Sequence, residues 1–535
     1  MEKIKNTNAV KWIIKNKYKL AVVVILLIGC LVRLVNIENL PNGLNCDEAS
    51  SGYEAYSIAE TGVDRNGNGM PVFLVSWGSG QNALYTYLLI PFVKVLGLNT
   101  LSIRLPMALI GCISLFIFYK LLLLLKNKKI ALIGLAFLAI CPWHIMKSRW
   151  GLESNIFPDL ILLAVYLIAY GVKNKKNIFT YLGFGALGLS SYAYGTSYFF
   201  LSFFVIPSLI YLVKKKEMKV KEAIISFAVM GVITIPIVLC VLINKFDIPE
   251  FQILCFTIPR MSSNRFEELA SVFSADFIKN SFTNFANSVK ILVTQSDGLG
   301  WNSINYIGTT YTFSLPLTLL GIWKSFRKKV KDEEDETSRV LSNLFNIWFI
   351  VSVILLFVCD PNINRINIIF IPIIYYTVIG LYEITKLNNK RIKITVISML
   401  TTAYLLAFVA FGYLYINTDF SNFAVFEDNL KEVIEYVDGK EADNIYIDGT
   451  FKEPYMYMLF YTKEDPKVFH ETVKFYRGDK MDFGNVKSYS NIYFYLPESM
   501  KENNIYVIDK RRNISIDESK FKVKEFERFI VLEKK

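Results

Sequence analysis

The sequence predicts a polytopic α-helical membrane protein that ends in a small soluble α/β domain. Of its 535 residues, 53% are hydrophobic, which is more than soluble domains usually contain. The apolar residues lie in long runs with almost no charge, and several approach the ~20 residues that cross a bilayer. These runs are Leu20–Val35, Ile130–Pro142, Phe157–Ala169, Ile224–Ile243, Leu344–Val358 and Ile394–Ile416. Residues 417–535 lack such runs.

The orientation of the helices follows from the position of the positive charge. The net charge is +12, and the excess lies in short Lys/Arg clusters between apolar runs, which is typical of cytoplasmic loops and not of a nucleic-acid-binding surface. Residues 1–19 carry six Lys and one Glu, so we expect a cytoplasmic N-terminal segment. The other clusters, placed on the same side, are Lys126–Lys129, Lys173–Lys176, Lys214–Lys221, Lys324–Lys331 and Lys386–Lys393.

This arrangement gives about eleven transmembrane helices within residues 20–416. Leu20–Val35 is expected to be an uncleaved anchor, because no small-residue cleavage site and soluble chain follow it. Two long outer loops result, residues 36–104 and residues 244–311. Ala83–Gly97 is apolar, but counting it as a span would place the next Lys/Arg cluster, Lys126–Lys129, on the outer side and reverse the orientation of every later helix. We therefore predict an amphipathic helix at the outer interface there.

The C-terminal part of the chain changes character. It is polar, and its short alternating runs are typical of strands. A helical pattern, Phe426–Val437, comes first, and the strand-like runs are Asn444–Asp448, Ile492–Leu496, Ile505–Ile508 and Arg528–Leu532. Because the last span exits the cytoplasm, we predict that residues 417–535 form an extracytoplasmic α/β domain.

Cysteine and histidine usage limits the possible metal chemistry. The seven Cys include no CxxC pair, and the only two His are His144 and His470, which excludes a His-rich metal site. Cys46 and Cys255 are expected on the outer side, and the sequence leaves open whether they pair.

Polar residues gather in the segments that this topology places at the outer face, a depth where charged residues are costly and usually functional. They are Asp47 and Glu48 in the first loop, Arg149 and Glu153 in the second outer turn, Tyr192 and Tyr194 in the third, Asp297 in the second long loop, and Arg365 where the tenth helix begins. A carboxylate can deprotonate an acceptor hydroxyl, and arginines can hold a departing phosphate. Aromatic rings can stack on sugars. Group transfer from a lipid-linked phosphate fits this set.

The first outer loop resembles a known family. The segment Cys46-Asp47-Glu48-Ala49, followed by Tyr53, Gly62, Gly78 to Leu88, Leu96-Gly97 and Arg104-Leu105-Pro106, is similar to the opening of the GT-C glycosyltransferases. Within them it looks like the protein O-mannosyltransferase and aminoarabinose-transferase branch. Asn82-Ala83 stand where that branch often has two prolines. The resemblance implies a polyprenyl-phosphate sugar donor and a glycan, lipid or protein acceptor.

The same resemblance implies roles for individual residues. Asp47 would be the catalytic base, and Glu48 would support it or bind a divalent metal ion, whose need stays open. Arg149 and Glu153 would match the polar cluster of the second outer turn, and Arg365 would lie near the donor phosphate. Further substrate contacts are expected from Tyr85, Tyr192, Tyr194 and Asp297.

Each of these residues also has a structural alternative. Asp47 and Glu48 would cap a short helix, and Arg149 and Arg365 would anchor helix ends at the interface. Glu153 would pair with Arg149, and the tyrosines would belong to an aromatic belt. Two other classes of protein remain: a transporter or lipid flippase, and a non-catalytic scaffold in envelope assembly. A transporter is disfavoured by the absence of sequence repeats and by charges that gather at one face.

Overall fold

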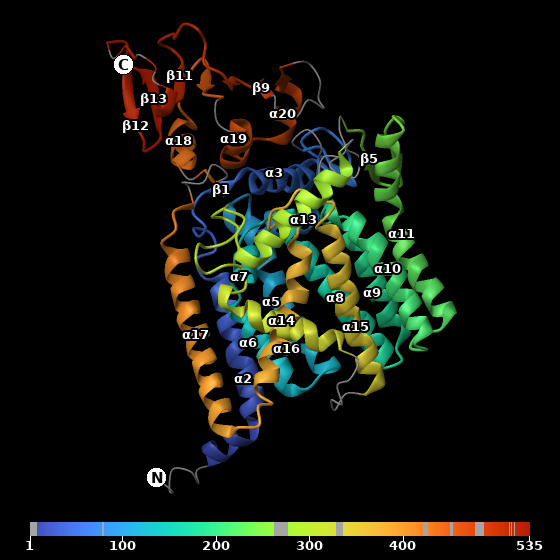
Figure 1. The fold of residues 1–535 in the computed structure, drawn as a ribbon. Coiled ribbons are helices and arrows are strands. Elements are labelled where there is room, and N and C mark those ends of the chain that lie inside the picture. Colours follow the sequence, from blue (N-terminus) through green and yellow to red (C-terminus); the bar gives the residue numbers. More distant parts are fainter. Residues whose placement is uncertain are drawn as a thin grey trace.

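The computed structural model of the chain is a bundle of long helices with a small sheet-containing domain at one end (Figure 1). The structure describes residues 8–535 except 77–79, 262–275, 328–334, 421–425, 428, 450–452, 477–485, 513, 515 and 518, and it describes side chains from residue 15 onward. Gly78 and Ser79, which belong to the motif of the first outer loop, lie outside the described residues.

Seven helices in the described part of the chain are long and apolar enough to cross a membrane. They are α5 (Thr100–Leu125), α8 (Glu153–Lys173), α10 (Thr196–Lys214), α11 (Val220–Lys245), α15 (Glu336–Leu355), α16 (Phe370–Ile384) with the turn before it, and α17 (Lys390–Ile416). An eighth span is bent by 58° between α6 (Lys128–Ile140) and α7 (Pro142–Ser148). Pro142 is the first residue of α7, a position that favours proline. The chain is therefore a multi-pass membrane protein.

Three more helices of the bundle are not among these spans: α2 (Asn8–Leu34), α9 (Asn177–Ser190) and α14 (Leu315–Phe326). The number of about eleven spans thus stays a prediction. α2 begins at Asn8, so residues 8–19 are helical and continue into the first apolar run, and their cytoplasmic location stays a prediction. α14 packs closely on α16, since a Cβ at Gly321 or Gly380 would collide with a backbone carbonyl of the other helix.

The first outer loop is built around two helices. α3 (Cys46–Thr61) lies across the end of the bundle, beneath the C-terminal domain (Figure 1). α4 (Leu84–Leu96) is a short apolar helix at the place where an interfacial helix is predicted. Two-residue strands β2 (Phe73–Leu74) and β3 (Gln81–Asn82) pair between them. The second long loop contains the hairpin β4 (Phe251–Ile253) and β5 (Phe256–Ile258), and then α13 (Phe277–Thr294).

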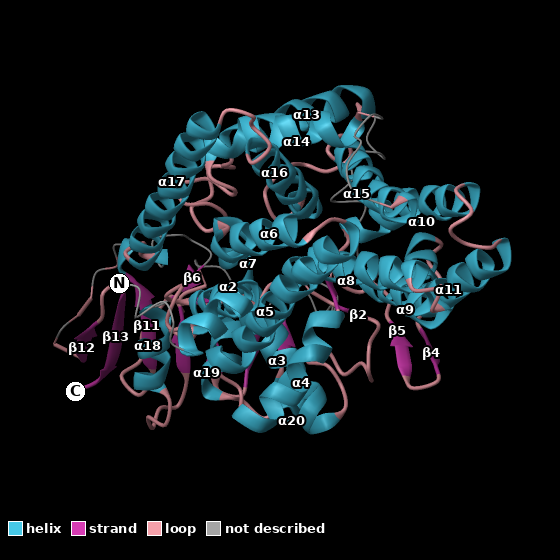
Figure 2. Cartoon of the chain, turned by 90° about the horizontal axis from the view of Figure 1, so that it is seen from below, coloured by secondary structure: helices cyan, strands magenta, loops and turns pink. Residues whose placement is uncertain are grey.

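The C-terminal domain contains a mixed seven-stranded sheet of order β12-β13-β11-β7-β10-β9-β8. Its strands are β7 (Ile445–Ile447), β8 (Lys474–Phe475), β9 (Val486–Tyr489), β10 (Ile492–Tyr493), β11 (Ile505–Asp509), β12 (Phe521–Glu525) and β13 (Phe529–Lys534). The four runs predicted as strands are confirmed as β7, β10, β11 and β13. Three helices accompany the sheet: α18 (Asn429–Val437), α19 (Pro454–Thr462) and α20 (Pro466–Thr472). Figure 2 shows β11, β12 and β13 of this sheet beside α18 at one edge of the molecule.

The two parts of the molecule are joined by a short antiparallel strand pair. β1 (Leu44–Asn45) lies directly before α3 and pairs with β6 (Phe426–Glu427), so that Asn45 faces Phe426. The predicted helix Phe426–Val437 is therefore wrong in its first turn, because these residues are recruited into a strand by β1. The C-terminal domain is thereby attached to the start of α3.

Candidate active site

The start of α3 holds the two carboxylates predicted to be catalytic. Asn45 caps the helix, since its side-chain oxygen accepts from the N–H of Asp47 at 2.8 Å. Its own N–H donates to the Glu48 carboxylate at 3.2 Å, which completes a capping box. The capping alternative therefore applies to the Glu48 side chain. Asp47 is half-buried beside it, at a helix N-terminus whose dipole favours a negative charge.

Glu48 is fully buried and pairs with Arg104 of α5. The guanidinium donates from Nε to Oε1 at 2.8 Å and from Nη2 to Oε2 at 2.9 Å, a bidentate arrangement. Oε1 also accepts from the N–H of Gly151 at 2.9 Å. Arg104 donates further to the carbonyls of Pro41 and Gly43, both at 2.7 Å. Glu48 thus connects α3, α5 and the turn before α8, and its oxygens are engaged within the protein.

Arg149 lies in the turn between α7 and α8 and is buried. Nη1 donates to the carbonyl of Val32 at 2.9 Å, and Nη2 donates to those of Asn36 and Leu40 at 3.2 and 3.0 Å. Its guanidinium also lies over the Tyr415 ring at 5.8 Å. Arg149 therefore holds the C-terminal end of α2 against α17, and its terminal nitrogens donate to carbonyls instead of to Glu153.

Glu153 is the first residue of α8 and contacts the segment before α4. Its Oε2 accepts from the N–H of Asn82 at 2.5 Å. The Asn82 side chain donates in turn to the carbonyl of Ser191 at 3.1 Å and to the hydroxyl of Tyr198 at 3.0 Å. Asn82, which stands where the resembled branch often has a proline, is thus buried and connects α8, α9 and α10.

The three predicted tyrosines are packed around the same segment. Tyr85 is buried and donates to the carbonyl of Ile103 at 2.5 Å, and burial raises its pKa well above the ordinary value. The Tyr192 carbonyl accepts from the N–H of Leu84 at 3.0 Å, and the Tyr192 hydroxyl donates to the carbonyl of Ile233 at 2.7 Å. Tyr194 is also buried. In this conformation the rings of Tyr85 and Tyr194 present no open face for a sugar.

Asp297 contacts the turn that carries Arg365, although the two residues belong to different loops. Asp297 Oδ2 accepts from the N–H of Ile363 at 2.9 Å, which ties the second long loop to the turn before α16. Arg365 lies two residues further on and forms an ion pair with Asp360, Nη1 to Oδ2, at 2.5 Å. The Arg365 side chain is 29% exposed, so its guanidinium is open to the surroundings.

An apolar cluster places these loops around the start of α3. Trp150 of the second outer turn, Ile304 of the second long loop and Phe426 of β6 belong to one buried cluster. The Trp150 and Phe426 rings lie 5.6 Å apart. Because Phe426 pairs with Asn45, the second outer turn and the second long loop both pack where α3 begins. The geometry therefore gathers Asp47 and the loops that carry Arg149 and Asp297 at one end of the bundle.

Known proteins with this arrangement are found among solved structures. No protein-family model matches the sequence, and no curated protein matches it. The structure is similar to ArnT from Cupriavidus metallidurans bound to undecaprenyl phosphate, with a TM-score of 0.57, 11% identity and 98% of both chains covered. The chain has the GT-C glycosyltransferase fold.

The oligosaccharyltransferase of Archaeoglobus fulgidus, tethered with an acceptor peptide containing the NVT sequon, shares the GT-C fold with this chain at a TM-score of 0.52 and 13% identity. That match covers 84% of this chain and 64% of the oligosaccharyltransferase. The same enzyme in complex with Zn and sulfate gives a TM-score of 0.52, with 83% and 61% covered. The chain thus spans less than two thirds of the length of the oligosaccharyltransferase.

A buried network of charged side chains within the GT-C bundle was not predicted from the sequence. Arg33 of α2 donates from Nη2 to Nδ1 of His144 at 2.8 Å, which leaves the ring proton on Nε2. That nitrogen lies 3.6 Å from Oδ1 of Asp159 on α8. Lys147, one turn after His144, pairs with the other oxygen of Asp159. The sequence could have indicated this network only through charged residues that lie within apolar segments. Which of them pair depends on how three helices pack.

A second buried ion pair supports the middle of α3. Glu54 Oε1 lies 3.1 Å from Nε of Arg65, and both side chains are buried. Burial raises the pKa of Glu54, and the charge of Arg65 acts against that rise. Arg65 also lies over the Tyr455 ring of α19 at 5.8 Å. This pair therefore helps to hold α3 against the C-terminal domain.

Metal-ligating side chains do not gather at this site. Within the described residues, no three His, Cys, Asp or Glu side chains are placed to hold a metal ion. None of the seven cysteines, all of which lie in the described part of the chain, forms a disulfide, Cys46 and Cys255 included. The Glu48 carboxylate, the candidate metal ligand, is held by Arg104 and Gly151.

Proposed function

We propose that this protein is a membrane glycosyltransferase that moves a sugar from a polyprenyl-phosphate donor to an acceptor hydroxyl at the outer face of the bundle. The observation that carries the proposal is the structural likeness to ArnT bound to undecaprenyl phosphate over 98% of both chains. The acceptor is a hydroxyl on a glycan, a lipid or a protein, and no nucleic acid is involved.

Asp47 is the proposed catalytic base. Its neighbour Glu48 is fully engaged by Arg104 and two backbone N–H groups, so it serves as a positioning residue for the start of α3. Asp47 is the half-buried carboxylate of the pair, and its main chain is fixed by the Asn45 cap. A fixed backbone and a side chain that is only partly buried suit a group that must reach an acceptor proton.

Arg365 is a better candidate than Arg149 for holding the donor phosphate. Both terminal nitrogens of Arg149 donate to carbonyls at the end of α2. Arg365 is partly exposed and uses Nη1 for Asp360, which leaves Nε and Nη2 for phosphate oxygens. The guanidinium fork suits that contact. Asp297 orients the turn that carries Arg365, so it is proposed to act through that residue.

The proposed reaction is a single displacement. Asp47 takes the proton of the acceptor hydroxyl as the acceptor oxygen forms a bond to the anomeric carbon of the sugar. The bond between that carbon and the phosphate oxygen breaks, and polyprenyl phosphate leaves with the electron pair. Displacement from the opposite side inverts the anomeric configuration. Stabilising the phosphate charge in a site away from water would contribute much of the rate enhancement.

Asp47→Asn tests the proposal. We expect transfer from a panel of radiolabelled polyprenyl-phosphate sugars to fall by at least ~10² in membranes that contain this variant, because a general base contributes about that much. Glu60→Gln is the matched control, since Glu60 is an exposed carboxylate at the other end of the same helix. Equal expression and thermal stability of the three proteins would show that the fold is intact.

Two outcomes would contradict the proposal. Transfer by Asp47→Asn at the wild-type rate would remove Asp47 as the base. Failure of the wild-type protein to transfer from any donor would favour a flippase or an envelope scaffold with the same GT-C fold.

A further inference from the structure

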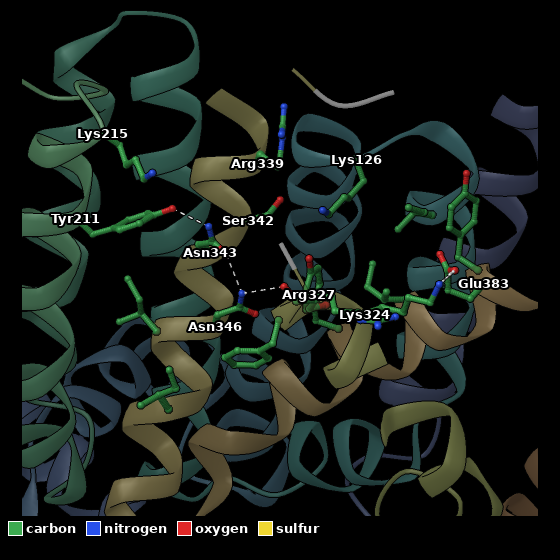
Figure 3. Close-up of a pocket in the computed structure, with 18 residues that line it drawn as sticks. Lys126, Tyr211, Lys215, Lys324, Arg327, Arg339, Ser342, Asn343, Asn346 and Glu383 are labelled. Carbon is green, nitrogen blue, oxygen red and sulfur yellow. Dashed lines mark hydrogen bonds and ion pairs between the residues drawn. The ribbon is translucent and has the colours of Figure 1, made fainter. Parts of the chain in front are cut away.

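A cavity in the described part of the chain lies among helix ends in the basic connections of the bundle, not beside α3. Its volume is about 700 Å³. The ends of α10, α14 and α16, the starts of α6 and α15, and Lys126 directly after α5 surround it (Figure 3). Its charged lining residues are Lys126, Lys215, Lys324, Arg327, Arg339 and Glu383. These connections carry the clusters that place this face in the cytoplasm by the positive-inside rule.

The cavity has an excess of positive charge. Five cations and one carboxylate line it. Glu383 is already neutralised, because Lys324 and Lys386 lie 3.0 and 2.7 Å from its oxygens. Lys215, Arg327 and Arg339 form no ion pair with any described residue. Within the described part of the chain, these three cations are thus the ones left to contact an anionic ligand.

The floor of the cavity offers a hydrogen-bond donor. The Asn343 side chain donates to the Tyr211 hydroxyl at 2.6 Å and accepts from Asn346 at 2.8 Å. The Asn346 oxygen accepts from Tyr376 at 2.9 Å. The amide groups are thus used by one another, whereas Tyr211 keeps its hydroxyl proton to donate. A lining of cations and a donor matches phosphate oxygens.

The cavity is also bordered by apolar side chains. Ile347 and Ile350 of α15 and Phe326 of α14 line it, and Ile350 and Phe326 are exposed on the bundle surface. The guanidinium of Arg327 lies 4.4 Å from the Trp323 ring centre, which fixes its position near the same surface. A ligand with an anionic head and an apolar tail would contact both kinds of wall.

We propose that this cavity binds the phosphate headgroup of an anionic membrane lipid from the leaflet opposite Asp47. Basic pockets between transmembrane helices on the cytoplasmic side recognise such headgroups. Lys215, Arg327, Arg339 and the Tyr211 hydroxyl would contact the phosphate, and the acyl chains would follow α15. The site is distinct from the start of α3, and its occupancy is measured without any sugar transfer.

Native mass spectrometry of the full chain in detergent tests this site. The probe is phosphatidic acid, compared with phosphatidylcholine of the same acyl chains. We expect the wild type to prefer phosphatidic acid. Arg339→Gln and Lys215→Gln should each lower its affinity about fivefold, because a basic residue near a membrane surface contributes ~1 kcal/mol. Tyr211→Phe removes the donor without changing charge and should lower affinity less.

Arg391→Gln is the matched control. Arg391 is an exposed cation in the first turn of α17 and does not line the cavity. An equal loss of affinity for phosphatidic acid in this variant would show that the lipid is held by general attraction to the basic surface and not by the cavity, and would overturn the proposal. Displacement of the lipid by millimolar inorganic phosphate would assign the cavity to free phosphate instead of a lipid. Equal binding of both lipids would likewise overturn the proposal.

Discussion

Two adjacent carboxylates illustrate how far residue-level inference reaches. The motif around Asp47 and Glu48 was readable in the sequence, as was the capping alternative. Which carboxylate is structural and which is only half-buried could not be predicted, because the difference depends on Arg104, which lies far along the chain. Glu48 is held by that arginine and by two N–H groups. Asp47 stays half-buried and is the carboxylate proposed to act on the acceptor.

Replacement of Glu48 tests its positioning role. Glu48→Gln leaves the fully buried Arg104 without a counter-charge, and breaking a buried pair this way costs about 3–5 kcal/mol. We therefore expect a clear fall in the thermal midpoint in detergent and a parallel loss of sugar transfer.

Glu60→Gln serves again as the comparison, since an exposed carboxylate changes stability by less than ~0.5 kcal/mol. A Glu48→Gln protein that melts like the wild type would argue against the role assigned to this ion pair.

At the scale of elements, the long apolar helices and the regular strands were predictable, and the short connecting elements were not. α11 and α17 follow from composition alone, because a bilayer requires runs of that length. β1 and β6 contain two residues each and exist because distant parts of the chain meet. Local periodicity carries no information about such a pair, and for this reason Phe426 was predicted as helical.

The same strand pair is supported by an ionic chain in the C-terminal domain. Arg528 donates to Glu427 of β6 at 2.5 Å and to Asp509 of β11 at 3.0 Å. Burial acts to raise the pKa of Asp509, but hydrogen bonds from Arg511 and the charge of Arg528 outweigh it and hold the pKa at about 2. Asp509 thus anchors the arginine that orients β6.

The pH dependence of this anchor can be predicted in sign. The folded-state pKa of Asp509 lies below the ordinary value near 3.9, so its stabilisation is complete above about pH 4 and disappears as the pH falls towards 2. Asp509→Asn should lower the unfolding free energy by about 2 kcal/mol at pH 6, and this difference from the wild type should shrink between pH 4 and pH 3. Thermal unfolding of the full chain at each pH measures it.

Glu502→Gln provides the control for that series, because Glu502 is an exposed carboxylate of the same domain. A difference between wild type and Asp509→Asn that stays constant from pH 6 to pH 3 would show that the carboxylate charge is not what stabilises β6.

At the scale of the whole molecule, composition and charge predicted a membrane bundle, and the structure adds how its two ends differ. One end carries α3 and the C-terminal domain. The basic connections lie away from α3 and surround a cavity between helix ends. The sequence could not predict that cavity, because its lining comes from five helices that meet only after folding. The assignment of each end to a side of the membrane rests on the positive-inside rule.

The native cysteines offer a direct test of that orientation. Cys255, in the β4–β5 hairpin, is exposed, whereas the other six are buried or half-buried. We expect a membrane-impermeant maleimide to label Cys255 in intact cells, because the hairpin belongs to the predicted outer loop. A cysteine placed at Lys175, in the α8–α9 turn of a Cys255→Ser protein, should react only after permeabilisation. The opposite pattern would invert the topology.

One glycine in α3 has a consequence for how this protein can diverge. A Cβ at Gly52 would lie 2.7 Å from Ile103 of α5 and 2.8 Å from Phe460 of α19, so both neighbours approach the helix as closely as a glycine permits. Substitutions at these three positions should therefore be correlated among homologues. A gene fusion that replaced only the C-terminal domain would separate partners adapted to each other. We expect the domain and the first outer loop to be inherited as one unit.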